Sequence, residues 1–128
     1  MSVGQLSKLS VTETVRVDGD RLVELWVRMG QARAEEVITL SVDNLWRGLG
    51  ALSHAQSAGN YELMAERARG LSQIADNLGL WLFAKVARDV EACARRGDVP
   101  AISSCLNRLQ RVSDQSISTV WDLCDITS

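Results

Sequence analysis

The chain has 128 residues, of which 46% are hydrophobic and 23% charged, with one proline and a formal net charge of −2. This composition is that of an ordinary globular protein, and the length suits one domain with its own hydrophobic core. The slightly acidic balance argues against a nucleic-acid-binding protein, which normally carries an excess of basic residues.

The sequence shows no signal for a membrane span or for secretion. No stretch approaches the ~20 consecutive apolar residues that a spanning helix needs, and the opening MSVGQLSKLSVTETV lacks the apolar run of a signal peptide. The cysteines Cys93, Cys105 and Cys124 are odd in number, and no pair has the C-x-x-C spacing of a metal site. We therefore expect a soluble cytoplasmic protein with reduced cysteines.

The N-terminal residues differ from the rest of the chain. Residues 1–17 are rich in Ser, Thr and Val, and the run VTETVRV has the composition of a β-strand without a partner. We predict a flexible arm over residues 1–17, or an extension that packs on a second copy. One helical domain is predicted over residues 18–128.

Hydrophobic periodicity predicts a short helix over residues 20–29, ending at Gly30, and a long helix over residues 32–56. Gly59 is suited to end the long helix, and Asn60 to cap the next one. The apolar face of the short helix consists of Leu22, Leu25, Trp26 and Met29. The long helix carries the 4-3-4-3 seam of a helical bundle at Ile38, Val42, Leu45, Leu49 and Leu52.

Three more helices are predicted over residues 61–77, over residues 80–96, and from the turn RGDVP to near Cys124, with Gly97 ending one helix and Asp98 capping the next. Their inward residues are Met64, Ala68, Leu71, Ala75 and Leu78; Phe83, Val86, Val90 and Cys93; and Ile102, Leu106, Leu109, Val112, Ile117 and Val120. The short connections predict an all-α, antiparallel up-down four-helix bundle with a short extra N-terminal helix.

Four of the six aromatic residues are tryptophans. Tryptophan is usually well buried, so we expect each to fill the core or its edge. An exposed tryptophan would indicate an interface.

Two stretches carry a family resemblance: ERARGLSQIADNLGL (66–80) and ARDVEACARRGD (87–98). They resemble the histidine-containing phosphotransfer (HPt) domain of bacterial phosphorelays, whose central pattern is roughly A-H-x-L-K-G-x-x-x-N-L-G, followed by a helix with L-E and a GD turn. Ala68, Leu71, Asn77, Leu78 and Gly79 match in register, and Val90-Glu91 replaces L-E. The similarity covers about residues 32–122 and implies an HPt-like bundle.

The residues that carry the family's chemistry are replaced here. The resemblance places the phosphorylated histidine at Arg69, the following lysine at Ser72 and the following glycine at Gln73. An arginine cannot accept the phosphoryl group, because its guanidinium stays protonated with a pKa above ~12. The resemblance thus implies a degenerate HPt protein that is not an enzyme, and that binds a response-regulator receiver domain or a histidine kinase without carrying phosphate.

Helical periodicity places the candidate docking residues of this stretch on one outward face. We expect Arg69, Ser72, Gln73 and Asp76 on that face, with Lys85 or Arg88 beside them on the neighbouring helix. The alternative to a docking role is that Arg69 is simply a solvated surface arginine.

Two other functions stay open. The chain could be a structural or oligomerisation bundle, with the N-terminal arm and last helix forming a homodimer contact. It could also be an active phosphotransfer protein that uses His54, its only histidine, which lies two residues past Leu52 and should face solvent. No Gly-rich phosphate loop and no inward Glu-x-x-His motif is present, so we expect no cofactor and no bound metal.

Overall fold

The computed structural model describes residues 19–127, and its side chains through residue 125. The predicted arm over residues 1–17 lies outside this part of the chain. The elements of the described residues are all helices: α2 (Gly19–Met29), α3 (Gln31–Ser57), α4 (Tyr61–Asn77), α5 (Trp81–Arg96) and α6 (Val99–Thr127). The predicted all-α bundle with a short N-terminal helix is confirmed, and the predicted bounds agree to within a few residues.

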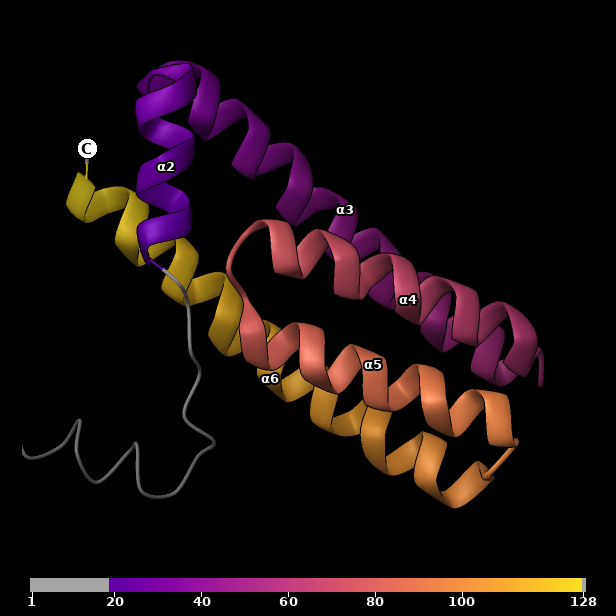
Figure 1. Ribbon diagram of the computed structural model, residues 1–128. Helices are drawn as coiled ribbons and strands as arrows, with labels where there is room; N and C mark the ends of the chain where they lie inside the picture. The colour runs from indigo at the N-terminus through magenta and orange to yellow at the C-terminus, as the bar shows by residue number, and fades with distance from the viewer. Residues whose placement is uncertain (1–18, 128) are drawn as a thin grey trace, which may run out of the picture.

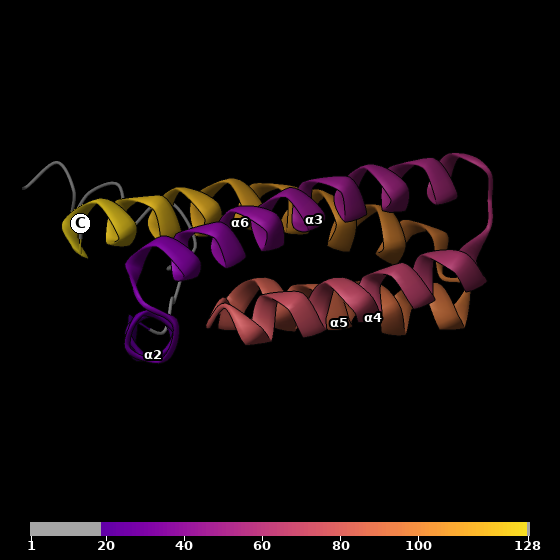
Figure 2. The same cartoon turned by 90° about the horizontal axis from the view of Figure 1, so that it is seen from above.

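The four longer helices form two layers (Figures 1 and 2). The long helices α3 and α6 make one layer, and the shorter α4 and α5 make the other. Each helix packs against the next along the chain, whereas α3 and α6 touch each other only slightly. Helix α2 lies against α3, beyond the turn that joins α4 to α5.

Residues with special backbone properties set the helix ends. Gly97 has φ 66°, the left-handed conformation that ends α5, and Gly79 has φ 76° in the turn before α5. Asn60 caps α4, because its side-chain oxygen accepts a hydrogen bond from the Leu63 amide at 3.1 Å. Asp98 accepts from the Ala101 amide at 3.2 Å in the first turn of α6. The predicted caps are therefore confirmed.

The core is built from the predicted seams. All the inward residues predicted for the long helices are buried, with Phe83, Leu45 and Met64 fully enclosed. In α2, Leu22 is buried, and Leu25 and Trp26 pack against the core. Met29 departs from the prediction: its side chain is exposed at the last turn of α2.

The prediction that all four tryptophans fill the core or its edge is wrong for three of them. Trp46 is 45% exposed, Trp81 43% and Trp121 37%, whereas Trp26 packs against the core. The seams of α3, α5 and α6 are filled by aliphatic residues and Phe83, so these three indoles remain on the outside of their helices.

Helices α4 and α5 make the most extensive contact in the bundle. Small residues line their buried faces: Ala65, Ala68, Ser72 and Ala75 on α4, and Ala84, Ala87 and Ala94 on α5. Small side chains allow two helix backbones to approach closely. This close contact makes the outer surfaces of α4 and α5 one continuous face.

Candidate functional site

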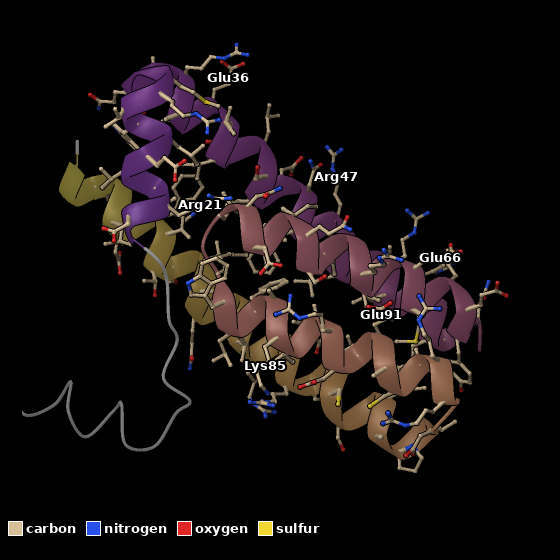
Figure 3. The ribbon with its side chains drawn as sticks, viewed as in Figure 1. Arg21, Glu36, Arg47, Glu66, Lys85 and Glu91 are labelled. Carbon is tan, nitrogen blue, oxygen red and sulfur yellow. The ribbon has the colours of Figure 1, made fainter. Side chains whose placement is uncertain are left out.

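The outer side of α4 carries a stripe of exposed side chains at helical spacing. Glu62, Glu66, Arg69 and Gln73 are exposed, and Asp76 is half-exposed. These residues are separated by three or four positions, so they lie one above another on the helix. Figure 3, which labels Glu66, views the molecule from this side. Arg69 is therefore at the middle of an accessible stripe, as the sequence predicted.

Ser72 is a correction to the predicted docking face. It is buried, at 4% exposure, and its hydroxyl donates a hydrogen bond to the Arg69 carbonyl oxygen at 2.7 Å. The prediction considered only one seam on α4. Because α4 packs against α5 as well as α3, a second row of small residues that includes Ser72 is also covered. Ser72 cannot contact a partner at this surface.

A matching stripe lies on α5. Trp81, Lys85 and Arg88 are exposed and stand at positions i, i+4 and i+7 of the helix. Lys85 is labelled in Figure 3. Trp81 was not among the predicted site residues, although its spacing from Lys85 and Arg88 placed it on their face. We name the set Arg69, Gln73, Asp76, Trp81, Lys85 and Arg88 the α4–α5 surface.

Ion pairs neutralise most of the cations on and near this surface. Arg88 Nη1 lies 3.1 Å from Asp76 Oδ2 and so joins α5 to α4. Lys85 Nζ lies 3.6 Å from Asp89 Oδ2, on the same helix. Arg69 has no ion pair or side-chain hydrogen bond with any other side chain that the structure describes. Its guanidinium thus stands as an exposed, uncompensated positive charge between neutralised neighbours.

His54 is exposed near the C-terminal end of α3, as predicted. Helix α3 belongs to the other layer of the bundle, so His54 and the α4–α5 surface are carried by different layers (Figure 2). The structure does not bring His54 together with Arg69, Gln73 or Lys85. Any phosphate chemistry at His54 would need its own binding residues.

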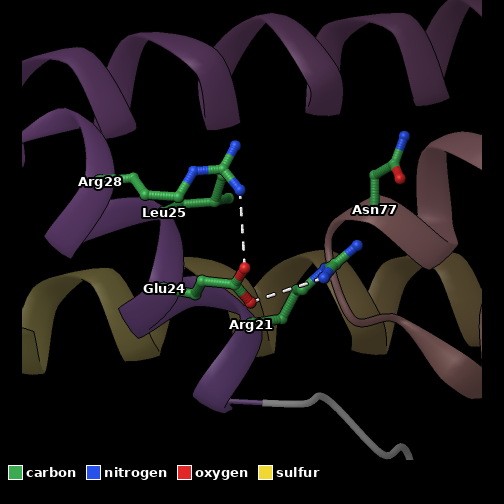
Figure 4. A pocket seen from close by; sticks show the side chains of 5 residues that line it. All are labelled: Arg21, Glu24, Leu25, Arg28 and Asn77. Atoms are coloured by element: carbon green, nitrogen blue, oxygen red, sulfur yellow. Dashed lines mark ion pairs between the residues drawn. The ribbon is translucent and has the colours of Figure 1, made fainter.

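A small pocket of about 160 Å³ lies between α2 and the end of α4 (Figure 4). Arg21 and Arg28 of α2 line it together with Leu25, and Asn77 closes it from α4. Glu24 lies between the two arginines, 3.5 Å from one guanidinium and 3.6 Å from the other. Because Glu24 already pairs with both guanidinium groups, an anion in this pocket would have to compete with its carboxylate.

Two further properties bear on function. In the part of the chain that the structure describes, no three His, Cys, Asp or Glu side chains cluster as metal ligands would. None of the described helices combines the length and hydrophobicity that crossing a membrane would require.

Comparison with known proteins bears on the fold. Neither a scan against protein-family models nor a search of curated proteins found a match. Among solved structures, histidine-containing phosphotransfer protein B (HptB) from Pseudomonas aeruginosa PAO1 is similar, with a TM-score of 0.79. The match covers 85% of this chain and 94% of that one. The chain has the HPt fold. At 19% sequence identity, this similarity is evidence for the fold and not for the chemistry.

The fold agrees with the resemblance seen in the sequence. Gly79, the last residue of the N-L-G match, adopts the positive φ of the turn between α4 and α5. Gly97 and Asp98, the GD turn, end α5 and cap α6. The matched residues are thus those that shape an HPt-like bundle, whereas the replaced residues Arg69, Ser72 and Gln73 lie on α4, before the first of these turns.

Proposed function

We propose that the chain is an HPt-like protein of two-component signalling that binds a receiver domain or a histidine kinase without carrying phosphate itself. The binding site is the α4–α5 surface. The observation that carries the proposal is the exposed, uncompensated guanidinium of Arg69, at the position where the family resemblance places the phosphorylated histidine.

The chemistry of arginine supports binding without transfer. A guanidinium holds its protons at physiological pH and has no free lone pair to attack an acyl phosphate. It can instead donate several hydrogen bonds to a carboxylate, in a geometry that favours paired contacts. Arg69 therefore suits the acidic pocket of a receiver domain as an anchor rather than as a phosphate acceptor.

The surroundings of Arg69 support a specific interface. Trp81 supplies a large exposed aromatic side chain on the same surface, and tryptophan and arginine are the residues most enriched among energetically dominant interface contacts. The pairing of Arg88 with Asp76 fixes both side chains before a partner arrives. Arg69 can bind a carboxylate of the partner without breaking an ion pair of this chain.

The test is a titration of the full-length protein against a panel of receiver domains and histidine kinases. Arg69→Glu should weaken binding by about tenfold or more, because it replaces an attractive charge at the centre of the interface with a repulsive one. Arg67→Glu is the matched control: it makes the same charge change on α4, but Arg67 lines a separate groove, which lies between α3 and α4. Failure of every panel member to bind, or equal effects of the two substitutions, would contradict the proposal.

A homodimer is the second candidate, and the exposed Trp121 of α6 is the observation that favours it. Light scattering after size exclusion separates the two functions. A dimer that dissociates on Trp121→Ala would support an oligomerisation role, whereas a monomer that binds receivers would exclude it.

A further inference from the structure

Two cysteines from neighbouring helices meet where α5 ends and α6 begins. Cys93 stands in the last turn of α5, and its Sγ lies 3.6 Å from the Sγ of Cys105, in the second turn of α6. Cys93 is buried and Cys105 is half-buried. The two sulfurs are therefore held in contact by the packing of the helices that carry them.

The two thiols have different surroundings. Arg96 donates a hydrogen bond from Nη2 to Cys93 Sγ at 3.4 Å, so a positive charge is placed to bind negative charge on that sulfur. The pKa of Cys105 is raised to about 11, mainly by burial and to a smaller extent by the hydrogen bond with Cys93. The sulfur of Cys93 thus lies beside a cation, and the thiol of Cys105 keeps its proton at neutral pH.

We propose that Cys93 and Cys105 form a modification site for small oxidants of the peroxide class, which convert the thiol pair into a disulfide that joins α5 to α6. The sulfurs must move from contact to the bonding distance of about 2.05 Å. Rotation of the two side chains provides this movement, because the helices are already side by side.

The chemistry needs one peroxide per disulfide. The Cys93 thiolate attacks one peroxide oxygen; the S–O bond forms, the O–O bond breaks, and hydroxide leaves and takes up a proton to become water. Cys105 sulfur then attacks Cys93 sulfur: the S–S bond forms, the S–O bond breaks, and the departing hydroxide takes the Cys105 proton as a second water. Two thiols are oxidised, and peroxide is reduced to two waters.

The third cysteine provides an internal comparison. Cys124 is buried at the opposite end of α6 from Cys105, and burial raises the pKa of its thiol. A buried thiol whose pKa is raised reacts slowly, because little of it is present as the reactive thiolate. Peroxide should therefore select the pair over Cys124.

A disulfide at this place would close only a short segment, the turn of Gly97 and Asp98 with the adjoining helix ends. Such a cross-link acts mainly by restricting the unfolded chain. It would hold the C-terminal end of α5 to α6 and so stiffen one end of the bundle. The oxidised protein should unfold at a higher temperature than the reduced one.

The site is tested on the full chain by peroxide treatment, alkylation of the remaining thiols under denaturing conditions, tryptic digestion and mass spectrometry. Cleavage after arginine places Cys93 in the peptide over residues 89–95 and Cys105 in the peptide over residues 97–108. We expect these two peptides to be joined, Cys124 to be alkylated, and a reducing agent to reverse both the link and the rise in the unfolding midpoint. Full alkylation of Cys93 and Cys105 after peroxide, or links that join separate chains, would overturn the proposal.

A substitution tests which sulfur attacks first. Arg96→Gln should slow the cross-link several-fold, because it removes the charge beside Cys93. Arg95→Gln is the control, since Arg95 pairs with Glu91, with 2.8 Å between Nη2 and Oε2. Equal rates in the two variants would overturn the assignment of Cys93 as the attacking sulfur.

Discussion

Arg88 of α5 reaches Asp76 of α4, with Nη1 3.1 Å from Oδ2, and this ion pair ties together the two helices of the α4–α5 surface. Both side chains are partly exposed, so the pair contributes only about 0–1 kcal/mol to the free energy of unfolding. Its larger effect is on the charge that a partner meets. Arg88 is neutralised, and Arg69 remains the uncompensated cation.

Removing the acidic member of this pair should strengthen binding to an acidic partner. Asp76→Asn frees the Arg88 guanidinium, so affinity for a receiver domain should rise about two- to tenfold and fall more steeply with added salt. Asp43→Asn is the matched control, since it frees Arg47 on α3, where the two groups lie 3.0 Å apart. Affinity that stays unchanged in Asp76→Asn would place the interface elsewhere.

Two glycines of α3 should respond oppositely to alanine. A Cβ at Gly50 meets nothing within 4 Å, so Gly50→Ala should raise the free energy of unfolding by about 0.5–1 kcal/mol through helix propensity. A Cβ at Gly48 would overlap the buried side chain of Leu71 on α4. Gly48→Ala should therefore lower stability by about 1–2 kcal/mol. Urea denaturation measures both, and a stabilising Gly48→Ala would mean that α3 and α4 pack less closely than described.

The Asn60 cap supports the start of α4. Asn60→Ala removes the acceptor for the Leu63 amide and should lower the free energy of unfolding by about 1 kcal/mol. Asn60→Asp keeps an acceptor and should restore most of that loss. Thermal denaturation followed by circular dichroism checks the pair, and equal stability of the alanine and aspartate variants would argue against the cap.

Stability should fall in alkaline solution partly because of Cys105. Its pKa is raised from 9.0 to about 11 in the folded chain, so between these values the unfolded chain loses the proton while the folded chain keeps it. The stabilisation is fully present below pH 9 and is lost as the pH rises through 11. Denaturant titrations at pH 8 and pH 10.5 should show a smaller pH effect in Cys105→Ala than in the unchanged protein. The same pH effect in both proteins would mean that Cys105 ionises equally well in the folded and unfolded chains.

The helices and their ends could be predicted because each depends on local residues. The seam of α3, for example, repeats at steps that only a helix places on one side, and Gly97 and Asp98 mark a turn by their own backbone and side-chain preferences. Helix α6 was predicted to end near Cys124, but it extends to Thr127. Its end was harder to predict because no glycine or proline marks it.

The candidate surface was harder to predict because it depends on which neighbours each helix acquires. Ser72 was placed outside because the seam through Leu71 accounted for one covered side of α4, whereas α5 covers a second. Trp81 was placed inside on the usual burial of tryptophan, but α5 already fills its inner side with Phe83 and small residues. The contact between Cys93 and Cys105 depends on how α5 and α6 align, and their spacing in the sequence does not specify this.

Native mass spectrometry of the full-length protein, mixed with phosphorylated receiver domains and their kinases, tests the central claim most directly, because it reports complexes and phosphate together. The account predicts a complex with at least one partner and no phosphate on this chain, and the same result for His54→Ala. Phosphate that appears on the chain and disappears in His54→Ala would contradict it, and would make the protein an active phosphotransfer protein that uses His54.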